Sequence, residues 1–341
     1  MSESIQDILF VELVGGIGDL LIALPAIHAI ARSHPDARVN VLTFPAHAEL
    51  IEKDPLIARI FTTPPEGGSR DYLSQTETLR DVMASERFDV VVSDASYGGI
   101  DRLVEGSGAR RKVSHLRQRS SGEEAIEERL VSLLVDEGLV DAAFRGLIGR
   151  IALSSDERLW ARVWLCNNLP GRKRSAVIHP GAGMAIKRWP TERFVSLGKW
   201  LAQEAELNVI ISAGDENRLA EEIALGVGAD AFILPKTGLR KFAAMVAEAV
   251  VFASVDTGPA RVAAAVGTYA IVLFGPSWAG LYGLRESSVN LQSPRPCPER
   301  MRFNFAEQSC WQSGVCIYPE IRSCVEDIGV EMVVSEIRKV L

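Results

Sequence analysis

Residues 8–19, ILFVELVGGIGD, join an apolar run to a glycine loop that contains one aspartate. Residues 8–14 predict a buried strand, and the apolar stretch 20–30 predicts a helix. α/β proteins use a strand, a glycine turn and a helix in this order to bring backbone close to a ligand at the helix N-terminus. The glycines remove side-chain bulk there, and Asp19 places a carboxylate at the same point.

The first half of the chain alternates apolar runs with helical patterns. Strands are predicted at residues 8–14, 39–44, 57–63, 88–93 and about 110–114, and helices at 20–32, 46–52, 74–86 and 123–138. Most of these strands are continuous apolar runs, which is typical of parallel strands buried on both faces. This half therefore predicts a parallel sheet covered by helices.

A second alternating set follows a connecting region at residues 150–174, which contains a predicted helix at 155–168. Strands are predicted at 175–179, 207–213, 231–234, 250–254 and 269–274, and helices at 191–205, 215–227, 239–248 and 258–266. The repetition predicts an α/β protein of two Rossmann-like βαβ domains facing across a cleft. We expect domains at residues 1–165 and 166–326, followed by a last helix at 327–341, with ligands at the carboxyl ends of both sheets.

Composition limits the classes of partner. The 341 residues carry a formal net charge of -7, which argues against a dedicated nucleic-acid binder. The longest apolar stretch, residues 20–31, is too short to span a bilayer and contains Pro25. The first residues lack the basic region of a signal peptide. We expect a cytoplasmic protein with at most peripheral membrane contact.

One loop of the second half combines small residues with positive charge. Residues 179–190, HPGAGMAIKRWP, follow a predicted strand. The small residues are Gly181, Ala182 and Gly183, and the bases are Lys187 and Arg188. This combination suits a phosphate-bearing ligand, because backbone approaches closely beside cationic side chains. The alternative is a surface loop with solvated bases.

Two further loops of the second half follow predicted strands. In residues 254–261, SVDTGPAR, a helix opens at Gly258, and its free N–H groups with Arg261 predict an anion site. Asp256 would repel a phosphate, so a sugar hydroxyl or a structural hydrogen bond suits it better. Glu216, after the strand at 207–213, either accepts hydrogen bonds from ligand hydroxyls or stabilises a helix N-terminus. Together the loops predict a diphosphate ligand held in the second half, with Asp19 supplied by the first, as in a nucleotide-sugar transferase.

A nicotinamide oxidoreductase is an alternative for the glycine loop. That fingerprint would read G-x-G-x-x-G and would need an acid at the end of the second strand. The spacing here differs, and the second strand ends in residues 43–45, TFP. A second alternative is a tight turn whose Asp19 only caps the helix.

The ordered set of motifs resembles the family 9 glycosyltransferases, the heptosyltransferases of lipopolysaccharide synthesis. The matching segments are residues 16–19 (GIGD), 24–26 (LPA), 179–181 (HPG), 187–190 (KRWP), 214–216 (GDE) and 256–259 (DTGP). The resemblance implies a GT-B fold and inverting transfer from a nucleotide-activated heptose, typically ADP-heptose, with no cofactor or metal in catalysis. It also implies that the last helix can cross back to the N-terminal domain.

The resemblance assigns roles to individual residues. Asp19 would be the general base, Lys187 would neutralise the diphosphate leaving group, and Glu216 would lie near the donor ribose or sugar. The residues that would hold the donor are Asp256, Thr257 and Gly258. The family often has histidine where this chain has Arg261, which can pair with phosphate but cannot act as an acid near neutral pH. This departure leaves open a GT-B-like protein that binds a nucleotide sugar without transferring it.

The acceptor is expected at the first half. Gly16 and Gly18 would let a glycan, a glycolipid or another hydroxyl acceptor approach. The basic run at residues 110–119 includes Arg117 and Arg119 and suits an anionic acceptor, although a solvated loop is the alternative.

Four of the five cysteines lie in one short segment. They are Cys297, Cys310, Cys316 and Cys324, spaced C-x12-C-x5-C-x7-C. No C-x-x-C pair is present, so the spacing is not a strong zinc signature. Reduced, buried thiols are one interpretation, and a structural zinc or iron ion is the other. Some protein-modifying heptosyltransferases are similar in carrying cysteine-bound iron, in a different spacing.

Overall fold

The computed structural model describes residues 4–65, 71–114, 116–117, 124–171, 174–212, 214, 217–302 and 307–341. It divides into two compact units, Met1–Ala152 and Leu153–Leu341. Among the described residues, no helix is both long enough and apolar enough to cross a membrane.

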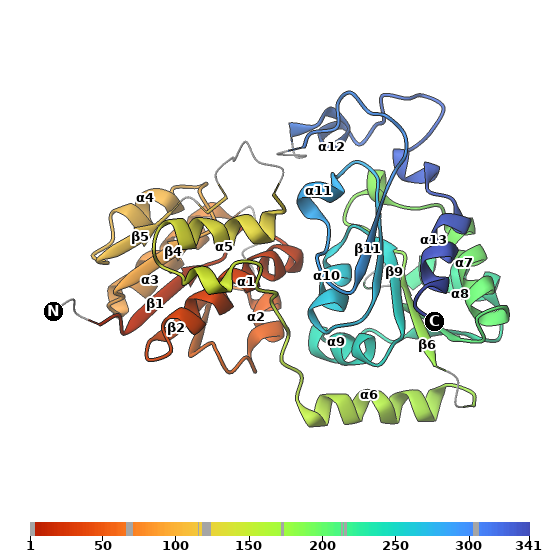
Figure 1. Ribbon diagram of the computed structural model, residues 1–341, viewed down its shortest axis with the longest axis horizontal. Coiled ribbons are helices and arrows are strands. Elements are labelled where there is room, and N and C mark those ends of the chain that lie inside the picture. Colours follow the sequence, from red (N-terminus) through yellow and green to blue (C-terminus); the bar gives the residue numbers. More distant parts are fainter. Residues whose placement is uncertain are drawn as a thin grey trace. The chain divides into compact units, whose positions relative to one another are not determined.

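The first unit is a five-stranded parallel sheet with helices on both faces (Figure 1). Its strands, in the order β3-β2-β1-β4-β5 across the sheet, are β1 (Asp7–Val11), β2 (Arg38–Thr43), β3 (Arg59–Thr62), β4 (Val90–Ser93) and β5 (Arg111–Val113). Its helices are α1 (Ile17–Ser33), α2 (Pro45–Ile51), α3 (Tyr72–Ser85), α4 (Ile100–Glu105) and α5 (Ile126–Asp136). The parallel sheet predicted from continuous apolar runs is confirmed.

The central strand β1 lies between two neighbouring strands and is covered by helices. In register, Phe10 lies opposite Val41 of β2 and Val92 of β4. On one face, Leu9 and other strand residues pack with α3 and α4 in a single apolar cluster. Helix α1 packs against α5, and its residues 20–31 are all buried.

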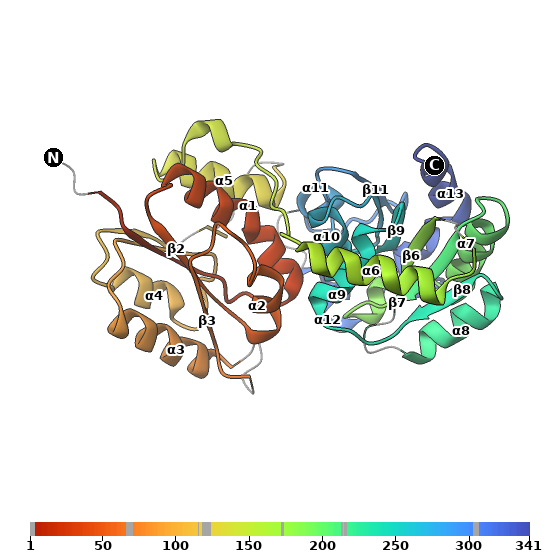
Figure 2. The same cartoon turned by 90° about the horizontal axis from the view of Figure 1, so that it is seen from below.

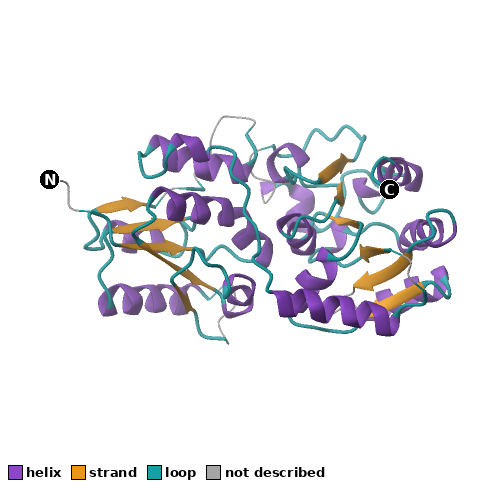
Figure 3. Cartoon of the chain, turned by 60° about the horizontal axis from the view of Figure 1, so that its bottom comes forward, coloured by secondary structure: helices purple, strands orange, loops and turns teal. Residues whose placement is uncertain are grey.

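The second unit repeats this architecture around a six-stranded parallel sheet. Its strands, in the order β11-β10-β9-β6-β7-β8, are β6 (Ser175–His179), β7 (Asn208–Ser212), β8 (Ala231–Leu234), β9 (Val251–Val255), β10 (Ala270–Phe274) and β11 (Ser288–Gln292). Its helices are α6 (Ser155–Asn168), α7 (Thr191–Gln203), α8 (Asn217–Val227), α9 (Leu239–Ala247), α10 (Gly258–Ala265), α11 (Ala279–Tyr282), α12 (Ser309–Ser313) and α13 (Val330–Arg338). Figure 3 shows strands between layers of helices in each unit.

The structure places the division between the units earlier than the sequence analysis does. The expected boundary at residues 165 and 166 falls inside α6. This helix packs against α9 of the second unit (Figures 1 and 2). The Glu157 carboxylate of α6 pairs with the buried Arg240 guanidinium of α9, with Arg240 Nη2 donating to Oε2 at 2.8 Å. Helix α6 is therefore part of the second unit.

The last helix, α13, packs on the second unit. It contacts α7 and β10, and Val333, Val334 and Ile337 are buried in the apolar core that these elements share. Its apolar stripe completes the core between α7 and the sheet. The expectation that it can also pack back on the N-terminal domain stays a prediction.

Removing apolar volume from α13 will test this packing. Ile337 is fully buried, whereas Met332 on the same helix is 38% exposed. We expect Ile337→Ala to lower the free energy of unfolding by about 2–5 kcal/mol, because it leaves a cavity. Met332→Ala should cost less than about 1 kcal/mol. Urea denaturation of both variants measures the difference, and equal losses would contradict the assigned face.

Candidate active site

In each sheet the strand order reverses at one point. Open α/β sheets bind ligands at such a point, outside the carboxyl ends of the strands. In the first unit β1 lies between β2 and β4, and in the second unit β6 lies between β7 and β9. The predicted glycine loop follows β1, and the predicted basic loop follows β6. In each unit the candidate residues therefore lie at the carboxyl ends of the strands, where this topology favours ligand binding.

Asp19 lies in the first turn of α1 and is held by two contacts. Its Oδ2 accepts the backbone N–H of Gly16 at 3.0 Å, and Arg117 Nη1 lies 3.1 Å from its Oδ1. The side chain of Asp19 is 28% exposed. The capping interpretation is thus correct as geometry, but the carboxylate also has an ionic partner and access to solvent. Gly16 is exposed beside it, and Gly18 is half-buried in the same turn.

Arg117 also reaches Asp94, which directly follows β4. Arg117 Nη2 lies 3.3 Å from Asp94 Oδ2, and the Asp94 side chain is fully buried. Burial raises the pKa of Asp94 well above its ordinary value; the Arg117 charge offsets part of this effect, and the carboxylates of Glu12 and Asp19 add to it. Glu12 is itself buried and accepts a hydrogen bond from Thr43 Oγ1 at 2.6 Å. Arg117 therefore joins two carboxyl groups, those of Asp19 and Asp94, at the edge of the first sheet.

In the second unit, Lys187 is paired with Asp256. Lys187 ends a 3₁₀ turn, Ala185–Lys187, and its Nζ lies 2.8 Å from Asp256 Oδ2 after β9. Ser277 Oγ, after β10, donates to the same oxygen at 2.7 Å. Burial opposes ionisation of Asp256, but Lys187, Arg261 and Ser277 outweigh it and leave the pKa of Asp256 below its ordinary value. The Asp256 carboxyl is therefore ionised at neutral pH.

The N-terminus of α10 lies directly beside this pair in the chain. Thr257 is its N-cap residue, and Thr257 Oγ1 is buried without a hydrogen-bond partner among the described residues. The first N–H groups of a helix have no intrahelical acceptor, so this end attracts anions. Arg261 is buried in the first turns and donates to the Tyr282 carbonyl oxygen at 2.7 Å. Its guanidinium thus ties α10 to α11.

The other predicted donor residues occupy different environments. Gly181 and Ala182 are buried, whereas Gly183 and Arg188 are exposed. Glu216, expected near the donor, and Arg119, expected near the acceptor, lie outside the described residues. Sequence analysis missed Asp94, Ser277 and Trp311; the signal for Asp94 was an acid at the end of a strand. The Trp311 ring lies 4.7 Å from Lys187 Nζ.

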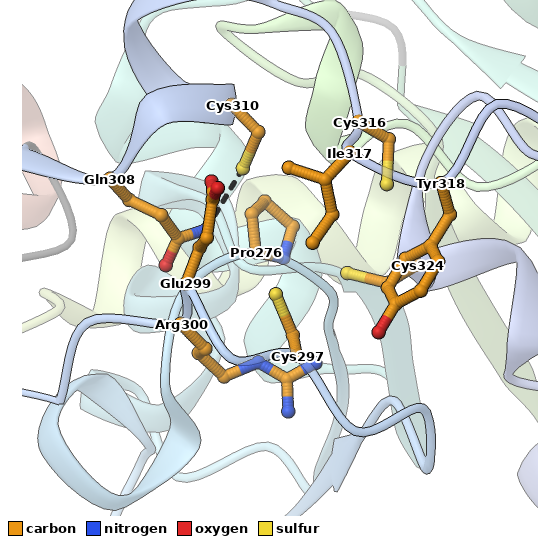
Figure 4. Close-up of a pocket in the computed structure, with 10 residues that line it drawn as sticks. All are labelled: Pro276, Cys297, Glu299, Arg300, Gln308, Cys310, Cys316, Ile317, Tyr318 and Cys324. Atoms are coloured by element: carbon orange, nitrogen blue, oxygen red, sulfur yellow. Dashed lines mark hydrogen bonds between the residues drawn. The ribbon is translucent and has the colours of Figure 1, made fainter.

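The four clustered cysteines line one pocket of the second unit. Figure 4 shows Cys297, Cys310, Cys316 and Cys324 with their sulfur atoms turned toward the same space. All four are free thiols, and Gln308 Nε2 lies 2.9 Å from Cys310 Sγ. Burial raises the pKa of the Cys310 and Cys324 thiols. Within the part of the chain that the structure describes, no group of three or more His, Cys, Asp or Glu side chains is arranged to hold a metal ion.

The sequence matches a family whose fold and site agree with this geometry. The model of glycosyltransferase family 9 (heptosyltransferase) matches residues 123–304, more than half of the chain. The chain therefore belongs to glycosyltransferase family 9. Its two Rossmann-like units are those of the GT-B fold.

Individual relatives cover most of the chain. Lipopolysaccharide heptosyltransferase 3 of Escherichia coli K12 is 26% identical over 279 residues, which covers 76% of this chain and 79% of that protein. The crystal structure of a family 9 glycosyl transferase from Veillonella parvula has a TM-score of 0.82 at 16% identity and covers 100% of this chain and 98% of that one. Escherichia coli heptosyltransferase WaaC with ADP-2-deoxy-2-fluoro heptose has a TM-score of 0.67 at 18% identity, covering 98% and 99%.

His179 ends β6 and makes the stability of the second unit depend on pH. Its Nδ1 lies 3.0 Å from Ser212 Oγ, and burial lowers its pKa from 6.5 to about 4. Between these values the unfolded chain binds a proton at His179 and the folded chain does not. Stability therefore falls as the pH drops from 6.5 to 4, by about 3 kcal/mol from this residue.

The variant His179→Gln removes this proton uptake. Urea denaturation at pH 7 and pH 4.5 should show a smaller loss of stability on acidification in the variant than in the parent protein. An equal loss in both proteins would show that His179 titrates alike in the folded and unfolded states.

Proposed function

We propose that the protein transfers a heptose from ADP-heptose to a hydroxyl group of a lipopolysaccharide-type acceptor. Support comes from family membership, from the relative named lipopolysaccharide heptosyltransferase 3, and from the WaaC structure with an ADP-heptose analogue. The family match also favours sugar transfer over the nicotinamide alternative. A GT-B-like protein that binds the nucleotide sugar without transferring it stays the second candidate.

The observation that carries the proposal is the Lys187–Asp256 pair beside the N-terminus of α10. An ammonium group, a Thr257 hydroxyl that has no hydrogen-bond partner among the described residues, and the positive N-terminal end of α10 together suit a diphosphate. We propose that Lys187 and this helix end neutralise the leaving diphosphate, so that catalysis needs no metal ion. One well-placed donor of this kind stabilises a transition state by about 2.7–4 kcal/mol. Gly181, Ala182, Gly183, Arg188 and Glu216 complete the proposed donor site.

Asp19 is the proposed general base. Its partly exposed carboxylate would take the proton of the acceptor hydroxyl as that oxygen attacks the anomeric carbon, and the diphosphate would leave from the opposite face with inversion. The same negative charge would stabilise the oxocarbenium character of the sugar. Gly16, Gly18, Arg117 and Arg119 are the proposed acceptor residues, and Arg117 supports this role by its contact with Asp19.

Neutralising Asp19 separates catalysis from donor binding. We expect Asp19→Asn to lower kcat about 10²–10⁴-fold, because a positioned general base contributes that much. The affinity for ADP should not change. The matched control is Asp101→Asn, which alters an acid in the first turn of α4. Near-normal turnover of Asp19→Asn with ADP-heptose would remove Asp19 from the mechanism.

Removing the Lys187 charge tests the donor site. We expect Lys187→Met to weaken ADP binding about 10- to 150-fold, since hydrogen bonds to charged groups contribute about 1.5–3 kcal/mol. Lys199→Met, at an exposed position of α7, is the control. Calorimetric titration with ADP measures both, and unchanged affinity in Lys187→Met would overturn the proposed diphosphate contact.

The cysteine pocket leaves two alternatives, reduced thiols and a structural zinc or iron ion. Thiols are a donor type that zinc and iron both bind, but the described side chains that line this pocket are not arranged around one point as metal ligands. We expect elemental analysis of the purified protein to distinguish them. About one metal ion per chain would establish the metal site, and a metal-free, folded protein with four titratable thiols would establish the reduced cluster.

A further inference from the structure

The segment between β11 and α13 is hydrogen-bonded to residues 186–193, which include the loop that carries Lys187. Trp189 Nε1 donates to the Ile328 carbonyl oxygen at 2.8 Å, and Arg193 Nη1 donates to the same oxygen at 2.8 Å. Ser323 Oγ donates to the Ile186 carbonyl oxygen, one residue before Lys187. These contacts join residues 135–139 positions apart in the sequence. The segment is therefore a structural neighbour of the proposed donor site.

Helix α12 of this segment presents two adjacent residues to different surroundings. Cys310 is buried in the cysteine pocket, and its carbonyl oxygen accepts the Gly314 N–H at 2.9 Å. Trp311, the next residue, lies with its ring 4.7 Å from Lys187 Nζ. Cys310 in the cysteine pocket thus anchors α12, and α12 in turn places the Trp311 ring beside the ammonium group of Lys187.

We propose that Trp311 is a positioning residue of the donor site, which holds the Lys187 ammonium for the diphosphate. This inference rests on the proposed function of Lys187. The ammonium group of Lys187 donates to the Asp256 carboxylate at 2.8 Å and to the Asp256 carbonyl oxygen at 3.4 Å. The indole face attracts the cation without neutralising it or accepting a conventional hydrogen bond. It also keeps water from one side of the ammonium, which strengthens the attraction between Lys187 and a phosphate.

A purely structural role for Trp311 is the competing interpretation, and a double-mutant cycle separates the two. If Trp311 acts through Lys187, its replacement has no effect on ADP binding once Lys187 is already methionine. If Trp311 only supports the local fold, its replacement weakens ADP binding to the same extent in both backgrounds.

The experiment compares ADP affinity by calorimetric titration for Trp311→Leu, Trp311→Phe and Lys187→Met, and for Trp311→Leu combined with Lys187→Met. We expect Trp311→Leu to weaken ADP binding about 3- to 30-fold, the range for a partly to fully desolvated cation–π contact. Trp311→Phe, which keeps an aromatic face, should recover most of the loss. The double variant should bind ADP as Lys187→Met does.

Trp160→Leu is the matched control, because the Trp160 ring lies 5.1 Å from Lys241 Nζ in a similar contact. It should bind ADP as the parent protein does. Circular dichroism checks folding, and Trp311→Met serves as a second ring-free variant if Trp311→Leu does not fold. Parent-like affinity of a folded ring-free variant, or an equal loss in both Lys187 backgrounds, would overturn the role of Trp311. Unchanged affinity of Lys187→Met would instead overturn the proposed donor site.

Discussion

The ion pair of Lys187 with Asp256 is the interaction on which the second unit's site depends. It joins the loop after β6 to the end of β9, two strands that pair directly in the sheet. Ser277 adds the end of β10 to the same carboxylate. A half-buried carboxylate at the proposed phosphate site would ordinarily repel the ligand. In the proposed donor site Asp256 instead fixes the ammonium group of Lys187, and the N-terminus of α10 adds positive potential beside the pair.

In the first unit the charges are reversed, because a cation contacts two carboxylates. Arg117 is a single guanidinium that reaches Asp19 and the buried Asp94. Asp19 would be mobile on its own, because it lies in the first turn of a helix and is partly exposed. The contacts with Gly16 and Arg117 give its carboxylate a defined orientation, which the proposed role as general base requires before a substrate binds.

The sequence predicted those strands and site residues that can be recognised from a local pattern of residues. Buried parallel strands were visible as continuous apolar runs, and Asp19 and Lys187 were visible because each follows such a run. Strand β11 was missed because it lies at the sheet edge, where all its residues are half-buried and the apolar signal is weak. Asp94 and Trp311 were missed because their partners are distant in the chain: Arg117 is 23 residues from Asp94, and Lys187 pairs with a ring in an irregular segment.

The pairing of Glu157 with Arg240 has a mechanical consequence. Ser154 caps α6 through Glu157, and the same carboxylate is bound to α9, so the start of α6 is locked to the second unit. The chain that links the two units is therefore held in place from Ser154 onward. Any hinge that lets one unit turn against the other must use backbone torsions before Ser154, and lengthening α6 would not loosen it.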